Sequence, residues 1–153
     1  MSESSNSSNS SNSTNSSGAP GTSEQGVPLI TEADIVAARQ KGRALALGIG
    51  FSPGDATLIA TAISELARNI VTYARRGEIR LIPIELNGKR GLTVVAKDEG
   101  AGIPDIRQAL QDGFSTAGRL GLGLPGVKRL MDEMEIVSEL GVGTTVTAKK
   151  WRT

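Results

Sequence analysis

The chain has 153 residues, of which 38% are hydrophobic, with 17 Lys and Arg against 16 Asp and Glu and with no cysteine or histidine. This length predicts one compact domain, and the formal charge of +1 provides no general basic surface for nucleic acid or an anionic membrane. The missing residue types exclude disulfides, thiolate nucleophiles, the usual zinc sites and an imidazole base, so acid–base chemistry must use carboxylates or lysines.

The amino-terminal segment differs in composition from the rest of the chain. Residues 2–17 are Ser and Asn apart from Glu3 and Thr14, and the residues that follow are rich in Gly, Pro and small polar types. Such a segment cannot bury enough apolar surface to fold. We therefore expect a disordered tail over 1–28 and one domain over 29–153. No secretion pattern and no apolar run near the roughly 20 residues of a membrane span occur, so a cytoplasmic protein is expected.

Two helices are predicted at the start of the domain. Thr31 begins the sequence T-E-A-D, a capping-box pattern, and a helix over 32–47 follows it. The run GFSPGD then breaks the chain. Asp55 is predicted to cap a second helix that ends at Arg75 or Arg76.

The remainder predicts two hairpins with helices between them. EIRLIPIEL reads as a strand, NGKRG as a turn and LTVVAKD as the partner strand, while Pro83 indicates an edge or a bulge. A short helix over 105–111, a helix over 125–134 and a final hairpin of EIVSEL and TTVTAKKW complete the chain. This order predicts an α+β fold, a two-layer α/β sandwich with helices on one face of a mixed, mainly antiparallel sheet.

A glycine-rich loop precedes the helix predicted over 125–134. GLGLPG, from Gly121 to Gly126, has the spacing G-x-G-x-x-G, but no strand precedes it, and Lys128 stands at the wrong position for a P-loop. Glycines nevertheless let backbone amides approach a ligand closely, and the N-terminus of the following helix suits phosphate. By itself, the pattern fits a phosphate loop and a plain flexible loop equally well.

The second helix carries the pattern E-x-x-x-N. Glu65 and Asn69 lie one turn apart, at the border of an apolar sector formed by Ile59, Ile63, Leu66, Ile70 and Tyr73. A carboxamide oxygen can ligate Mg²⁺, and a carboxylate can accept a proton. Taken singly, the pattern also fits a surface acid and an asparagine without a task.

A third pattern, DEGAGI, begins at Asp98 where a strand is predicted to end. Its carboxylate could accept a hydrogen bond from an exocyclic amine such as that of adenine, while the two glycines let a flat base lie close. A tight turn is the simpler alternative. The ordered set of E-x-x-x-N, D-x-G-x-G, the glycine loop and the G-x-G-T that ends at Thr144 is more specific than any single member.

This set resembles the GHKL ATP-binding family. The stretches ITEADIVAARQKGR, TAISELARNI, GIPDIRQALQDGFSTAG and GLPGVKRLMDE are similar to the serine/threonine switch kinases of the bacterial stressosome, which are kinases of the anti-sigma factor type. The resemblance implies a general base, Glu65; a magnesium ligand, Asn69; and an ATP site formed by Asn69, Asp98, Gly100, Gly102, Arg119, Gly121, Gly123 and Thr144. Arg119 stands where related anti-sigma kinases place a phosphate-contacting arginine.

The resemblance also implies an activity and its partners. The expected enzyme uses ATP and Mg²⁺ to phosphorylate Ser or Thr of STAS-domain scaffold and antagonist proteins, and then activates a PP2C-type phosphatase in a general stress and sigma-factor cascade. An alternative is an anti-sigma-type binding switch that acts mainly by sequestering its partner. A third possible class is an ATP hydrolase module in which Glu65 activates water. Such a module would need a transducer domain, and we find none in so short a chain.

Overall fold

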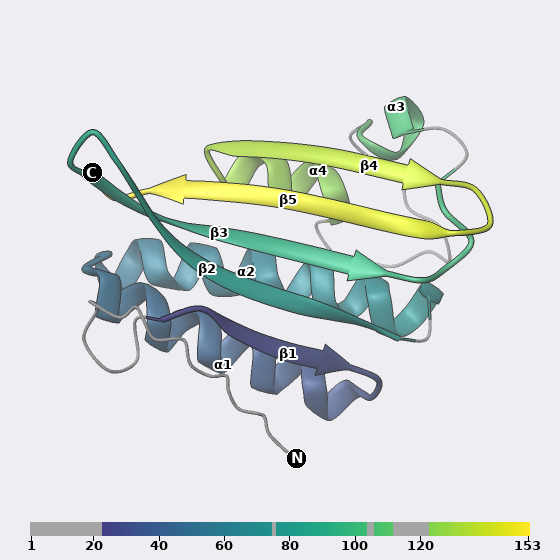
Figure 1. Ribbon diagram of the computed structural model, residues 1–153, viewed down its shortest axis with the longest axis horizontal. Coiled ribbons are helices and arrows are strands. Elements are labelled where there is room, and N and C mark those ends of the chain that lie inside the picture. Colours follow the sequence, from purple (N-terminus) through teal and green to yellow (C-terminus); the bar gives the residue numbers. More distant parts are fainter. Residues whose placement is uncertain (1–22, 75, 104–105, 112–122) are drawn as a thin grey trace, which may run out of the picture.

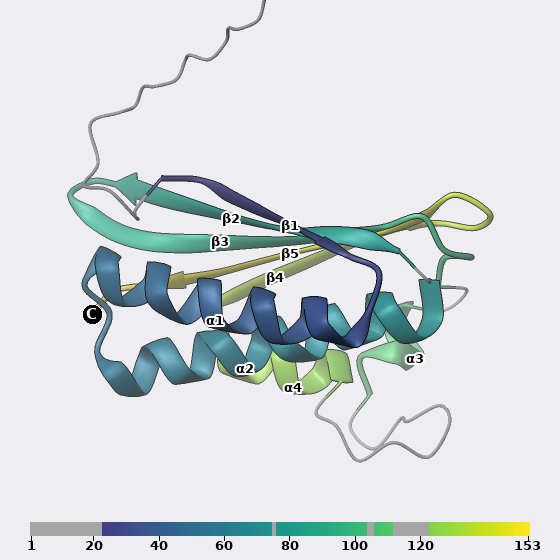
Figure 2. The same ribbon diagram turned by 90° about the horizontal axis from the view of Figure 1, so that it is seen from below.

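The computed structural model describes residues 23–74, 76–103, 106–111 and 123–153. They form two layers, a five-stranded sheet and a set of helices that covers one of its faces (Figures 1 and 2). The predicted α+β class is confirmed, and every described strand pair is antiparallel. No described helix combines the length and the hydropathy that a membrane span requires.

The strands follow the order β1-β2-β3-β5-β4 across the sheet. Their bounds are β1 Gln25–Leu29, β2 Gly77–Leu86, β3 Lys89–Asp98, β4 Glu133–Glu139 and β5 Gly143–Trp151. Asn87 and Gly88 join β2 to β3 and have φ angles of 54° and 79°, as a two-residue hairpin turn requires. The predicted turn is thus shorter than NGKRG.

Pro83 lies where β2 has only one neighbour among the described strands. The pairing of β1 with β2 ends at Gln25 opposite Leu81, whereas the pairing of β2 with β3 continues through Pro83. Beyond Leu81, β2 is therefore an edge strand, which is where a residue without an N–H is tolerated. The expectation from the sequence holds.

A strand spans the boundary that the sequence predicts between the tail, 1–28, and the domain, 29–153. β1 begins at Gln25, and the side chains of Val27 and Leu29 are 4% and 0% exposed. Pro28 was counted with the tail because of its residue type. It lies instead on β1, a strand at the border of the sheet, where proline is tolerated. The expected tail over residues 1–22 lies outside the described residues.

The helices are α1 Glu32–Ile49, α2 Pro53–Asn69, the π-helix η2 Ile70–Ala74, α3 Ile106–Ala109 and α4 Gly123–Leu130. An acidic side chain, Asp34, caps the start of α1. Asp34 Oδ2 accepts hydrogen bonds from the backbone amides of Ile30 and Thr31, both at 2.9 Å. The Thr31 hydroxyl donates to the same oxygen at 3.3 Å, so Asp34 carries the cap.

The cap of α2 is Ser52 rather than Asp55. The Ser52 hydroxyl oxygen accepts the backbone N–H of Asp55 at 3.1 Å, and Pro53 occupies the first helical position. Asp55 therefore lies inside the first turn, where its negative charge is favourable.

Tyr73 does not belong to the buried sector of the second helix. Ile59, Ile63, Leu66 and Ile70 are at most 2% exposed, but Tyr73 is 48% exposed. The reason is the change from α to π geometry at Ile70, because the wider i→i+5 turn rotates later residues less per step. The helical segment is described as far as Ala74, and Arg75, one of the two residues at which the helix was expected to end, lies outside the described residues.

The last helix was predicted too far along the chain. α4 ends at Leu130, and Glu133 and Met134, expected to be helical, begin β4. The backbone N–H of Asp132 donates to the carbonyl of Lys149 in β5 at 2.8 Å, so the chain already pairs with the sheet at this residue. The short helix expected over 105–111 is reduced to α3, and Asp105 lies outside the described residues.

The core lies between the sheet and the helices. Its largest fully buried side chains come from both layers: Leu29, Leu45, Ile59, Ile63, Leu66, Ile79, Leu81, Leu92, Val94 and Val127. Each contributes about 1.5–3 kcal/mol relative to exposure. This packing fixes α2 and α4 against the sheet, and the candidate site is built along their shared border.

Candidate active site

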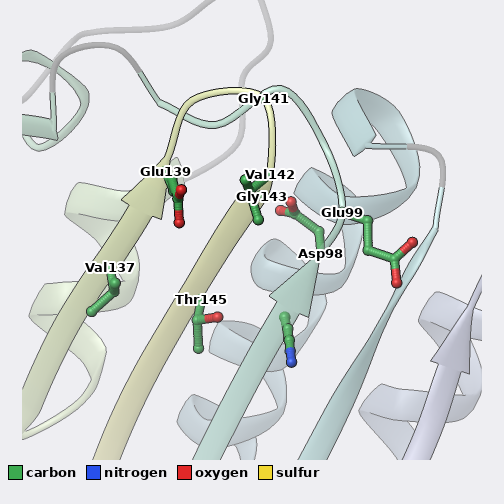
Figure 3. Close-up of a pocket in the computed structure, with 9 residues that line it drawn as sticks. Asp98, Glu99, Val137, Glu139, Gly141, Val142, Gly143 and Thr145 are labelled. Atoms are coloured by element: carbon green, nitrogen blue, oxygen red, sulfur yellow. The ribbon is translucent and has the colours of Figure 1, made fainter.

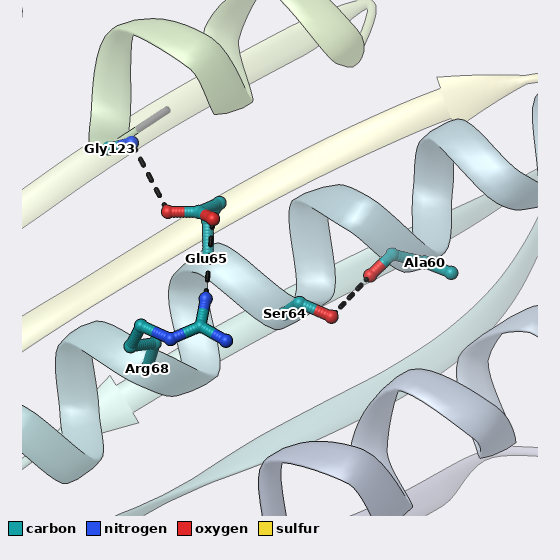
Figure 4. Close-up of polar contacts among 5 residues, drawn as sticks. All are labelled: Ala60, Ser64, Glu65, Arg68 and Gly123. Carbon is teal, nitrogen blue, oxygen red and sulfur yellow. Dashed lines mark hydrogen bonds and ion pairs between the residues drawn. The ribbon is translucent and has the colours of Figure 1, made fainter. Parts of the chain in front are cut away.

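Glu65 is the acidic side chain that the fold buries between two helices. It lies on α2 at the border of the core, and only 9% of the residue is exposed. Its Oε1 accepts the backbone N–H of Gly123, the first residue of α4, at 3.3 Å, and its Oε2 lies 3.3 Å from Nη1 of Arg68 (Figure 4). Two donors thus compensate a carboxylate that has lost most of its water.

The contact with Gly123 joins two motifs that are far apart in the sequence. Gly123 has a φ of 63°, in the left-handed region, and stands where the glycine loop enters α4. The structure therefore brings the E-x-x-x-N helix to the N-terminus of α4, a terminus that presents unpaired N–H groups to anions. Ser64, the neighbour of Glu65, bonds instead to the carbonyl of Ala60 at 3.0 Å within α2.

Asn69 closes α2 one turn after Glu65. Its side chain is half-buried and makes no hydrogen bond to any described residue, so its carboxamide oxygen is free to serve as a ligand. The described residues contain no group of three or more acidic side chains that could hold a metal. A single carboxamide fits Mg²⁺ held mainly by phosphate oxygens and water, and does not fit an all-protein metal cage.

Asp98 stands at the end of β3 with its two oxygens in different roles. Oδ1 accepts the backbone amides of Gly100 at 2.8 Å and Thr144 at 3.1 Å. Oδ2 has no partner among the described residues. The two amides fix the orientation of the carboxylate, and the second oxygen remains available to an external donor.

The loop after Asp98 is fastened to the β4–β5 hairpin through Ser138. The Ser138 hydroxyl oxygen accepts the amide of Ile103 at 2.7 Å and lies 2.8 Å from the Thr144 hydroxyl. The amide of Gly141 bonds to the carbonyl of Ala101 at 2.9 Å. Sequence reasoning missed Ser138. Its inward position in the alternating strand EIVSEL is the only signal in the sequence that could have revealed it.

The glycines of this region are needed by the protein's own packing. A Cβ on Gly100 would lie 2.9 Å from Cβ of Ala74, and a Cβ on Gly102, whose φ is 88°, would lie 2.7 Å from the carbonyl oxygen of Glu139. A Cβ on Gly143, whose φ is 150°, would collide with the carbonyl oxygen of Asp98. Glycine at these positions lets the loop pack closely against η2 and against the β4–β5 hairpin, a reason that the sequence did not disclose.

Two residues of the expected site are not described. Arg119 and Gly121 fall in 112–122, outside the described residues, whereas Gly123, the other glycine expected to bind phosphate, is described. The structure thus brings Glu65 to Gly123, and Asp98 to Gly100 and Thr144.

A hollow of about 660 Å³ opens beside the β4–β5 hairpin (Figure 3). It is lined by Lys97, Asp98, Glu99, Val137, Glu139, Gly141, Val142, Gly143 and Thr145. Along β4, Val137 and Glu139 are exposed, while Ile136 packs on the core between the sheet and the helices. The hollow therefore lies on the face away from the helices, and neither Glu65 nor Asn69 lines it.

Residues 27–150 match the family model of the histidine kinase-like ATPase domain. The chain is 56% identical to the serine/threonine-protein kinase RsbT of Bacillus subtilis (strain 168) over 125 residues, which is 82% of this chain and 94% of that protein. It is 36% identical to the anti-sigma F factor of Thermoanaerobacter sp. (strain X514) over 61% of this chain and 68% of that protein. The anti-sigma F factor of Geobacillus stearothermophilus is 37% identical over 63% of this chain and 69% of its own length.

Proposed function

The chain belongs to the histidine kinase-like ATPase domain family, and from that premise we propose that it transfers the γ-phosphate of ATP to Ser or Thr of STAS-domain proteins. Its class as an ATP-dependent serine/threonine-protein kinase follows from its 56% identity to the kinase RsbT over most of both chains. The observation that carries the mechanism is the buried carboxylate of Glu65 at the N-terminus of α4.

Asp98, Asn69 and the N-terminus of α4 have separate roles in this proposal. Asp98 accepts the exocyclic amine of adenine on Oδ2, while Oδ1 stays with its two amides. The N-terminus of α4 is directed toward the phosphates in this proposal, while the N–H of Gly123 stays bonded to Glu65. Asn69 offers one oxygen ligand for Mg²⁺, and the ion, when bound, neutralises phosphate charge.

Glu65 is proposed as the general base. The acceptor hydroxyl approaches its carboxylate, the hydroxyl oxygen forms a bond to the γ-phosphorus, and the bond from that phosphorus to the departing ADP breaks. The hydroxyl proton passes to Glu65. Burial against α4 keeps the carboxylate in one orientation, which is the positioning that such a transfer needs.

The partners are proposed from the resemblance to the stressosome switch kinases. The acceptors are scaffold and antagonist proteins with STAS domains, and the released kinase then activates a PP2C-type phosphatase in a stress and sigma-factor cascade. The reaction is placed in the cytoplasm, where ATP is abundant. In line with the position of β1, the catalytic domain is proposed to begin near Gln25.

Incubation with γ-labelled ATP and purified STAS-domain proteins of the same organism tests the proposal. The expected result is label on Ser or Thr of a STAS protein, which is lost when the kinase carries Glu65→Gln. Release of inorganic phosphate without any labelled protein would instead identify an ATP hydrolase and refute the kinase assignment.

A second candidate is a binding switch of the anti-sigma type, favoured by the similarity to anti-sigma F factors at 36% and 37% identity. This reading predicts stable capture of a purified sigma factor, with phosphotransfer as a secondary activity. Binding assays with a sigma factor and with the phosphatase, run side by side, separate the two candidates.

A further inference from the structure

We propose that Arg68 is a γ-phosphate-binding residue, which pairs with Glu65 in this structure and exchanges that carboxylate for the γ-phosphate of ATP. The inference rests on the proposed function, because it takes Glu65 as the base next to the transferred phosphoryl group. Arg68 is not part of the E-x-x-x-N pattern, and its sequence position alone did not single it out.

The position of Arg68 on α2 places it beside the base. It follows Glu65 by three residues, and Nη1 lies 3.3 Å from Oε2 of Glu65 (Figure 4). The Glu65 side chain is only 12% exposed, whereas that of Arg68 is 40% exposed. Arg68 is therefore the partner with room to move, and Glu65 is the fixed one.

The existing ion pair is weak enough to exchange. Half-exposed pairs of this kind are screened by water and typically stabilise a protein very little. A γ-phosphate carries more negative charge than a carboxylate and presents three oxygens. A guanidinium has five N–H donors that match phosphate in a bidentate manner, and Arg68 uses only Nη1 toward the described residues. The phosphate is thus the stronger partner.

The reacting groups also lie within reach. A base must be about 2.6–3.2 Å from the acceptor oxygen, and that oxygen is about 3–3.5 Å from the phosphorus in a near-attack geometry. The γ-phosphate is therefore within one side-chain length of a guanidinium that already touches Glu65. A change of partner would also free Oε2 for the acceptor hydroxyl, while Gly123 continues to hold Oε1.

In the transfer step, the acceptor oxygen bonds to the γ-phosphorus, the bond to ADP breaks and the proton moves to Glu65. Arg68 forms no covalent bond. It balances the charge on the γ-phosphoryl oxygens as they leave ADP, a contribution that preorganised cations make in other phosphoryl transfers. ADP has no γ-phosphate, so Arg68 should distinguish ATP from ADP.

Calorimetric titration with ATP and with ADP in Mg²⁺ tests this directly. Arg68→Gln should weaken ATP binding about 10- to 100-fold, as expected for the loss of a charged hydrogen bond, and change ADP binding less than about twofold. Arg39→Gln, an exposed arginine on α1, is the control for lost charge and should change neither. Equal losses for both nucleotides, or no loss for either, would overturn the inference.

A double variant separates phosphate binding from mere support of Glu65. If Arg68 touches the phosphate, Arg68→Gln should still reduce the preference for ATP in a Glu65→Gln background, and Arg68→Lys should recover part of it. If the effect disappears once the Glu65 charge is removed, Arg68 acts only through Glu65 and the inference is wrong. Absence of phosphotransfer by the wild type would refute the proposed function, yet the nucleotide comparison would still decide the role of Arg68.

Discussion

Asp98 Oδ1 accepts the backbone amide of Thr144 at 3.1 Å and thereby ties the end of β3 to the start of β5. The same oxygen takes the amide of Gly100 at 2.8 Å. One oxygen of this carboxylate is therefore structural, while the other is free for a ligand. This division of roles makes the adenine assignment testable without loss of the fold.

Asp98→Asn should separate these two roles. Its carbonyl oxygen can keep both backbone amides, which fixes the new NH₂ group at the position of Oδ2, where it would face the adenine amine donor to donor. We expect ATP affinity to fall at least about 10-fold, the value of one charged hydrogen bond, with little change in melting temperature. Isothermal calorimetry and thermal unfolding measure both.

Asp98→Ala is the matched comparison, because it also leaves two part-buried amides without their acceptor, at a cost of up to about 1–3 kcal/mol each. It should therefore lose thermal stability as well as affinity. Wild-type affinity for ATP in the Asn variant would show that adenine is read elsewhere.

Substitutions of Glu65 and of Asn69 should impair the enzyme in different ways. Glu65→Gln keeps an oxygen for the N–H of Gly123, so ATP with Mg²⁺ should still bind, while transfer in a single turnover falls about 10²–10⁴-fold. Asn69→Ala removes the proposed metal ligand, so Mg²⁺-dependent binding and transfer should fall together, with binding in EDTA unchanged. Near-normal transfer by Glu65→Gln would remove Glu65 from the role of base.

Asp34 should contribute an acid-sensitive part of the stability. Hydrogen bonds from the backbone amides of Thr31 and Ile30 lower the pKa of its carboxyl below the ordinary value of 3.8. The folded state therefore binds this proton less readily than the unfolded chain, and the stabilisation is present above pH 3.8 and lost as the pH falls through the lowered pKa.

Denaturant unfolding of Asp34→Ala across the acid range checks this dependence. The stability difference from the wild type should be largest near neutral pH and should shrink on acidification. Glu32→Ala removes another carboxylate from the same first turn and is the control. A difference that stays constant with pH would contradict the assignment of the cap to Asp34.

The position of β1 sharpens the test of the tail. Removal of residues 1–22 should leave the melting temperature and ATP affinity nearly unchanged, because this composition supports no core. Removal of residues 1–29 should lower the melting temperature markedly, because the buried side chains of Val27 and Leu29 are lost and β2 keeps only β3 as a partner. Equal stability of the two truncations would show that β1 contributes nothing.

Periodicity and turn chemistry predicted most of the fold. The helix beginning at Glu32, the Asn87–Gly88 turn and the alternating strands follow from local preferences that tertiary packing reinforces. The errors occurred where distant contacts decide. Asp132 is not helical because its backbone N–H pairs with the carbonyl of Lys149 in β5. Tyr73 is not buried because the helix changes to π geometry at Ile70.

Local patterns in the chain were enough to predict the class of the fold and the chemical types expected in the site, since E-x-x-x-N, D-x-G-x-G and the glycine loop consist of residues with suitable donors and acceptors. How these patterns combine depends on contacts between distant segments. Only packing of α4 against α2 brings the N–H of Gly123 to Glu65, and only the β3–β5 pairing brings the amide of Thr144 to Asp98. The pairing of Arg68 with Glu65 became visible for the same reason: hydrogen bonds form between atoms within about 3 Å of each other, and the fold sets those distances.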